Sequence, residues 1–82
     1  MKYHTIEEIR EIQRQINARE DRLRAISRLA TSIAQQLPSM SKTEVRTAAE
    51  QIKELREEVT ELKRFIERNK KIVSKFFAPA VA

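Results

Sequence analysis

The sequence lacks glycine, cysteine and tryptophan, and its 82 residues include only two prolines and four aromatic residues. Glycine is the usual residue of tight turns in small sheet proteins, so its absence argues against a sheet protein or an α/β enzyme of this size. The glycine-rich loops that cradle phosphates are excluded for the same reason. Without cysteine there is no disulfide framework, thiolate zinc site or thiol nucleophile. The length allows one small domain at most.

Long hydrophobic runs are also missing. The longest uncharged stretch, residues 29–41, is too short to span a bilayer, and it contains two glutamines and Pro38. Residues 1–10 carry Glu7 and Glu8 and have no apolar core, so they do not resemble a secretory signal. We therefore expect a soluble, cytoplasmic protein with no membrane contact, and the missing cysteine agrees with a reducing compartment.

Two helix-start signals divide the chain. Thr5 with Glu8, and Ser41 with Glu44, have the spacing of a capping box, in which the hydroxyl and the carboxylate satisfy free backbone N–H groups. Pro38 disfavours a helical conformation for the residue before it and removes a hydrogen-bond donor. The pattern predicts a single hairpin domain over 1–82, with a helix over 5–36, a loop over 37–41, a helix over 42–77 and a frayed tail over 78–82.

Apolar residues recur at heptad spacing in both predicted helices. With Ile9 at position a of a heptad lettered a to g, seventeen of the nineteen a and d positions are apolar, against 40% of the whole chain. A short loop forces neighbouring helices to run antiparallel, and in that arrangement every a position faces a d position. The sequence therefore predicts an all-α fold, an antiparallel two-helix hairpin with a coiled-coil-like seam.

The flanks of this seam carry more apolar residues than a two-stranded coil, which normally has charged residues at e and g. Off-seam and terminal positions that we assign to an oligomer interface are Ala18, Ala25, Leu29, Phe65, Ile72, Phe76 and Phe77. A one-sided seam only half-buries its residues, and small chains usually need more core or a partner. We expect self-association, with two hairpins forming a homodimeric four-helix bundle. In the alternative, the aromatic residues close the open end over Tyr3 and Ile6.

The two polar seam residues, Arg19 and Asn69, are candidates for setting the register. A polar residue at one core position costs stability but selects one partner arrangement. In the predicted register Arg19 faces Val59, and its guanidinium reaches Glu58 or Glu20. The alternative is an arginine that extends out of a loose seam with its stem buried. Asn69 would play the same role near the open end.

No group of residues has the spacing of a catalytic or metal site. We interpret His4, the only histidine, as an exposed residue at a helix start rather than a metal ligand, although three glutamates follow it closely. An acidic row on the second helix should be solvated, whereas carboxylates that act as acid–base catalysts need an apolar pocket. This row is Glu50, Glu54, Glu57 and Glu61. We expect no enzyme, no cofactor and no small-molecule substrate.

Basic residues exceed acidic ones by seventeen to twelve, for a net charge of +5. A basic row on the outer face of the first helix resembles those that follow a phosphate backbone. Its members are Arg10, Arg14, Arg24 and Arg28. Acids neutralise much of the charge, because Glu20 stands one turn before Arg24. The hairpin also places Glu7, Glu8 and Glu11 near Lys70, Lys71 and Arg68. Arg10, Arg14 and Arg28 are expected to stay unpaired. No aromatic residue is interleaved with the arginines, which disfavours single-strand stacking.

Residues 22–33, with the sequence RLRAISRLATSI, resemble the first helix of small proteins from phages and prophages of Gram-positive bacteria. That pattern has a leucine-and-arginine stretch followed by Leu-Ala-Thr-Ser-Ile, and a second charged helix follows it, as residues 50–72 do here. Some members of that family continue into a sigma-factor-like DNA-binding segment and look like late-gene transcription regulators. No such segment is found within these 82 residues.

Two functions follow as hypotheses. The first is a non-catalytic helical hairpin that self-associates and binds another protein, as a phage or prophage accessory factor would. The alternative is a nucleic-acid-associated regulatory protein that uses the basic row of the first helix.

Overall fold

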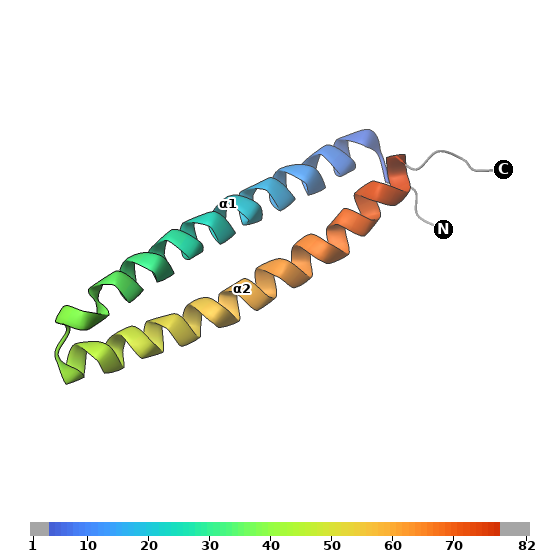
Figure 1. Ribbon diagram of the computed structural model, residues 1–82. Helices are drawn as coiled ribbons and strands as arrows, with labels where there is room; N and C mark the ends of the chain where they lie inside the picture. Colours follow the sequence, from blue (N-terminus) through green and yellow to red (C-terminus); the bar gives the residue numbers. More distant parts are fainter. Residues whose placement is uncertain (1–3, 78–82) are drawn as a thin grey trace.

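The computed structural model describes residues 4–77, which form two long helices lying antiparallel, side by side (Figure 1). Helix α1 spans Ile6–Gln36, the short 3₁₀ helix η1 spans Leu37–Ser39, and α2 spans Lys42–Phe77. The all-α prediction is confirmed. The segments expected over 5–36 and 42–77 correspond to α1 and α2, with α1 beginning one residue later. The expected tail over 78–82 and Tyr3 lie outside the described residues.

Both long helices begin at the hydroxyl residues that the sequence marks. The Thr5 hydroxyl accepts the backbone N–H of Glu8 at 3.2 Å, and the Ser41 hydroxyl accepts that of Glu44 at 3.3 Å. The Glu44 carboxylate completes its box by accepting the Ser41 backbone N–H at 3.1 Å, which lowers the pKa of Glu44. The Glu8 carboxylate instead meets the Thr5 hydroxyl and the His4 ring. Each start thus satisfies N–H groups that a helix leaves free.

The chain reverses without glycine, and no described residue has a positive φ. Pro38 lies in the first turn of η1, where its fixed φ is tolerated and its missing N–H costs nothing. The Met40 N–H closes η1 by donating to the Leu37 carbonyl at 3.1 Å, and the Ser39 hydroxyl donates to the Gln36 carbonyl at 3.0 Å. Proline and side-chain hydrogen bonds thus allow the chain to reverse direction, for which many turns use glycine.

The predicted seam contains every buried residue of the described chain. These are Ile9, Ile16, Ile26, Ile33, Ala48 and Ile66, of which only Ile16 is wholly buried. Ten other a and d positions are half-buried, and three are exposed. The heptad pattern therefore marks the face along which α1 and α2 pack, but the core between them is only one layer thick.

The hairpin is a rod rather than a compact domain. Its principal extents are 62 × 23 × 19 Å and its radius of gyration is 18.4 Å. A compact chain of this length would have a radius of gyration of about 12 Å. Neither described helix is long and apolar enough to cross a membrane. The shape leaves both edges of the seam open along the rod.

Candidate interaction surfaces

One edge of the seam forms a trough with an apolar floor and a basic rim, which we call the basic groove. It consists of two hollows of about 700 Å³ and 430 Å³ that share Ile52 and Arg56. The floor is made of a and d residues of both helices. They include Leu23, Ile26, Ala30, Leu55 and Val59 in the middle of the hairpin and Ile33, Leu37, Val45 and Ala48 near the loop. The basic groove thus exposes part of the side chains that hold the two helices together.

Small residues at e positions keep the basic groove open. Ser27 of α1 and Ala49 of α2 stand beside the floor and are exposed. The charged residues of the rim are Lys53, Arg56 and Lys63, with no acid among the lining side chains. Within residues 4–77 none of these three cations forms an ion pair. The groove therefore combines apolar surface with cations that form no ion pair within these residues, and of the three only Lys53 also lines a hollow with glutamates, namely Glu50, Glu54 and Glu57.

The opposite edge carries a hollow of about 480 Å³ with charges of both signs, which we call the mixed groove. Arg22 and Glu58 bridge the two helices there through a bidentate pair, with Nε–Oε2 and Nη2–Oε1 distances of 2.6 and 3.0 Å. The pair raises the pKa of Arg22 and lowers the pKa of Glu58. Leu29, 46% exposed, and Glu54 also line this groove. Both helices thus contribute polar groups around an exposed leucine.

The predicted oligomer residues are spread along the rod instead of forming one patch. Ala18, Ala25 and Leu29 are exposed on α1, and Phe65 and Ile72 are half-buried on α2. Phe76 and Phe77 end α2, whose C-terminal end lies opposite the loop (Figure 1). Their rings meet edge to face at a centroid distance of 5.0 Å. Leu29 is the one member of this set that lines a groove.

The two polar seam residues contact Phe65. The guanidinium carbon of Arg19 lies 3.6 Å from the centroid of the Phe65 ring, and Nη1 donates to the Gln15 carbonyl at 3.3 Å. The prediction that this guanidinium reaches Glu58 or Glu20 is wrong, because those carboxylates bind Arg22 and Lys70. The Asn69 amide donates to the Phe65 carbonyl at 2.8 Å. Both polar groups are thus satisfied within the hairpin.

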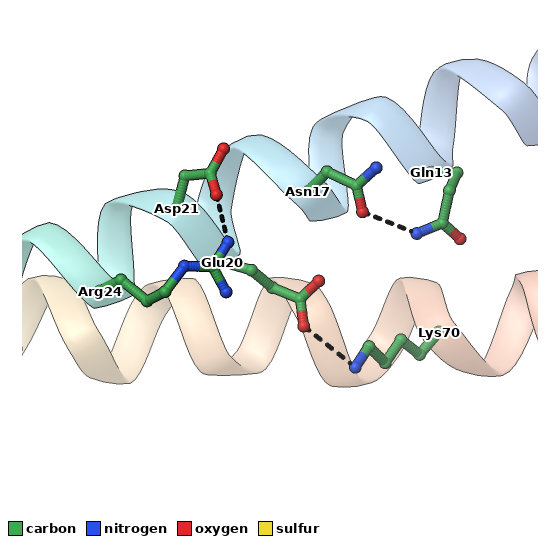
Figure 2. A network of polar contacts seen from close by, with 6 residues as sticks. All are labelled: Gln13, Asn17, Glu20, Asp21, Arg24 and Lys70. Atoms are coloured by element: carbon green, nitrogen blue, oxygen red, sulfur yellow. Dashed lines mark hydrogen bonds and ion pairs between the residues drawn. The ribbon is translucent and has the colours of Figure 1, made fainter.

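The ion pairs differ from the expected ones because helical side chains lean toward the N-terminus of their own helix. Glu20 of α1 meets Lys70 of α2 at 3.2 Å (Figure 2), so Lys70 does not pair with the glutamates at the start of α1. Arg24 bonds to Asp21 rather than to Glu20 (Figure 2). In antiparallel helices the side chains of the two helices tilt in opposite directions along the rod. The residues that touch therefore differ from those that the register of residue numbers predicts.

The outer arginines of α1 are all exposed, but two of them are neutralised locally. Arg14 bonds to Glu11 at 2.9 Å, so the prediction that Arg14 is unpaired is wrong, and Arg24 is paired with Asp21. Arg10 and Arg28 have no ion-pair partner among residues 4–77. Two separated free cations make a weaker phosphate-binding surface than the continuous row that the sequence predicts.

His4 contacts a single carboxylate. Its Nδ1 lies 3.2 Å from Glu8 Oε2, and this contact lowers the pKa of Glu8. Within the described residues no group of three or more His, Asp or Glu side chains is placed to hold a metal ion. Both ends of the contact are exposed, so it stabilises the start of α1 without forming a pocket for a substrate.

Sequence reasoning missed the basic groove. The available signal was the run of small residues at e positions, Ser27, Ala34 and Ala49, followed by Arg56 and Lys63 at later e positions. Small e residues leave a and d side chains uncovered, whereas long ones fold over them.

Comparison of the chain with models of known protein families, with curated proteins and with solved structures finds no match. The resemblance of residues 22–33 to phage and prophage proteins stays a prediction.

Proposed function

We propose that the chain is a non-catalytic helical hairpin that self-associates and binds another protein. The observation that carries this proposal is the thin seam, with six buried residues and an open groove along each edge. Covering apolar surface contributes about 25 cal/mol per Å², so further helices laid along these edges would stabilise the rod. The resemblance of residues 22–33 extends the proposal to an accessory factor of a phage or prophage.

The mixed groove suits a second copy of the chain. A symmetric dimer places the same patch of both copies together, so that patch has to complement itself. Arg22 with Glu54 and Glu58 offers both signs of charge, and Leu29 supplies an exposed apolar anchor. The basic groove would bring like charges together in such a dimer, which is unfavourable. We therefore place the dimer contact on the mixed groove, where two hairpins form a four-helix bundle.

The mass of the protein in solution tests self-association. Light scattering coupled to gel filtration at micromolar concentration should give the mass of a dimer. Leu29→Arg should shift the protein toward the monomer, because it introduces a charge at the centre of the contact. Gln35→Arg is the matched control, since Gln35 is exposed on α1 and lines neither groove, and it should leave the mass unchanged. A monomeric wild-type protein would overturn the proposal.

Binding of duplex DNA by the basic residues of α1 is the alternative function. If the chain served nucleic acid through α1, DNA affinity would fall steeply between low and physiological salt and would weaken in Arg10→Ala and Arg28→Ala. The proposed function expects no binding, or binding with a salt slope near zero. A steep slope that depends on these two arginines would favour the nucleic-acid function instead.

A further inference from the structure

We infer that the basic groove docks an acidic amphipathic helix of another protein. This inference rests on the proposed function, because it names the kind of partner that the hairpin binds. The occupant is an α-helix with an apolar stripe toward the seam and carboxylates on both flanks. Helices of this kind commonly lay an apolar face into a hydrophobic groove, using residues spaced three and four apart.

The shape of the groove fits a helix. Its two hollows share Ile52 and Arg56 and therefore join into one trough. On α1 the trough runs from Leu23 to Leu37, which at 1.5 Å per residue is about 21 Å, or four helical turns. Ser27 and Ala49 leave room for another backbone to approach the floor. A third helix along this edge would cover seam residues that the hairpin only half-buries.

The charge of the groove selects the sign of the partner. Lys53, Arg56 and Lys63 line the trough, and none of them is ion-paired among residues 4–77. Arg56 has no acidic residue three or four positions away on α2, so its charge is not balanced along its own helix. Glutamates flanking the apolar stripe of a bound helix would meet these cations at the rim, which favours an acidic partner over a basic one.

A second copy of this chain is a poor occupant of the basic groove. A symmetric contact would place the cationic rim against itself or against the α1 edge, which has Gln13, Glu20, Ser27 and Ala34 at the e positions beyond its first turn. The only acid among these four is Glu20, which is already bound to Lys70. Docking the mixed groove of another copy would be a head-to-tail contact, which generates rings or open chains rather than a two-fold dimer. A different protein would supply acidic residues for the rim without a like-charge contact and without head-to-tail assembly.

A synthetic peptide tests this inference directly. The probe has three heptads with leucine at a and d and glutamate at e and g, and its affinity is measured by fluorescence anisotropy with the full chain. The wild-type protein should bind it, and its lysine analogue should bind at least tenfold more weakly. The double variant Arg56→Glu, Lys63→Glu should also lose at least tenfold in affinity for the acidic peptide. The matched control Arg68→Glu, Lys71→Glu makes the same change in net charge away from the groove and should retain wild-type affinity.

The outcomes separate this inference from the proposed function. Circular dichroism first establishes that both double variants keep the helical content of the wild type. Failure of the acidic peptide to bind, equal loss in the two double variants, or displacement of the peptide by duplex DNA would each overturn the docking inference. Persistent dimer mass would then leave the proposed self-association standing. If Arg56→Glu, Lys63→Glu becomes monomeric, the groove holds a second copy and the inference is wrong, whereas self-association is upheld.

Discussion

Arg19 shows how a charged residue can occupy a core position of a thin seam. Its guanidinium lies over the Phe65 ring and donates to the Gln15 carbonyl, so its polar end is satisfied without a carboxylate. Its side chain is only half-buried, which keeps part of the charge in water. The role of Arg19 in setting the register stays a prediction.

Replacement of Arg19 by leucine should raise the melting temperature. A leucine at this d position would gain about 1–2 kcal/mol from apolar burial, whereas the lost cation–π contact with Phe65 is worth about 0.5–1 kcal/mol. Thermal unfolding followed by circular dichroism measures the change. Arg19→Lys is the control and should not raise the melting temperature, because lysine keeps the charge without the planar group that stacks on a ring. A lower melting temperature for Arg19→Leu would contradict this account.

The register role of Arg19 has a separate signature. If the arginine selects one arrangement of hairpins, the leucine variant should lose the single dimer mass proposed for the wild type and populate several species in light scattering. If the mass is unchanged and the melting temperature is higher, Arg19 lowers the stability of the hairpin and plays no part in selecting the register.

At the scale of elements, the start of α2 depends on its side-chain cap, because the chain reverses just before it without glycine. Ser41→Ala removes the hydroxyl that accepts the Glu44 N–H and should cost about 1 kcal/mol of unfolding free energy. Urea denaturation measures this as a lower midpoint at an unchanged slope. Ser74→Ala is the control, since Ser74 is exposed within α2 and caps no helix, and it should not lower the midpoint. Equal midpoints for Ser41→Ala and the wild type would show that the Ser41 hydroxyl does not stabilise the start of α2.

The helices follow from the sequence because their determinants are local. Thr5, Ser41 and Pro38 act on neighbouring backbone groups, and the heptad spacing identifies the buried stripe. The grooves and ion pairs depend instead on how far each side chain reaches and which way it leans. The contact of Glu20 with Lys70 joins residues fifty positions apart, and Arg22 takes the carboxylate expected for Arg19. Such contacts require the relative placement of two helices, which heptad letters leave undetermined.

The whole molecule has little interior to support it, so its stability is sensitive to association. Most seam residues are half-buried, and the two helices touch along a single face. A partner that binds the folded hairpin and not the unfolded chain stabilises it by mass action. A partner that covered either groove would therefore strengthen the same seam that holds the two helices together.

Stability of the whole hairpin should fall in acid. Hydrogen bonds from His4, from the Ser41 backbone and from Arg22 lower the pKa values of Glu8, Glu44 and Glu58 below the ordinary value of 4.5. The unfolded chain then binds more protons than the folded one near this pH. The stabilisation is therefore complete above pH 4.5 and is lost as pH falls through the folded-state pKa values. Protonation also leaves seventeen lysines and arginines without opposing charge.

Melting curves recorded from neutral pH down to about pH 2.5 separate these contributions. The double variant Glu44→Gln, Glu58→Gln should melt below the wild type at neutral pH, should lose less stability than the wild type between about pH 5 and pH 3, and should approach it in stronger acid. Glu57→Gln is the control, because Glu57 forms no ion pair within residues 4–77, and its profile should run parallel to that of the wild type. If the double variant also ran parallel to the wild type, the two capped and paired carboxylates would not be the source of the acid sensitivity, and general charge repulsion would account for it.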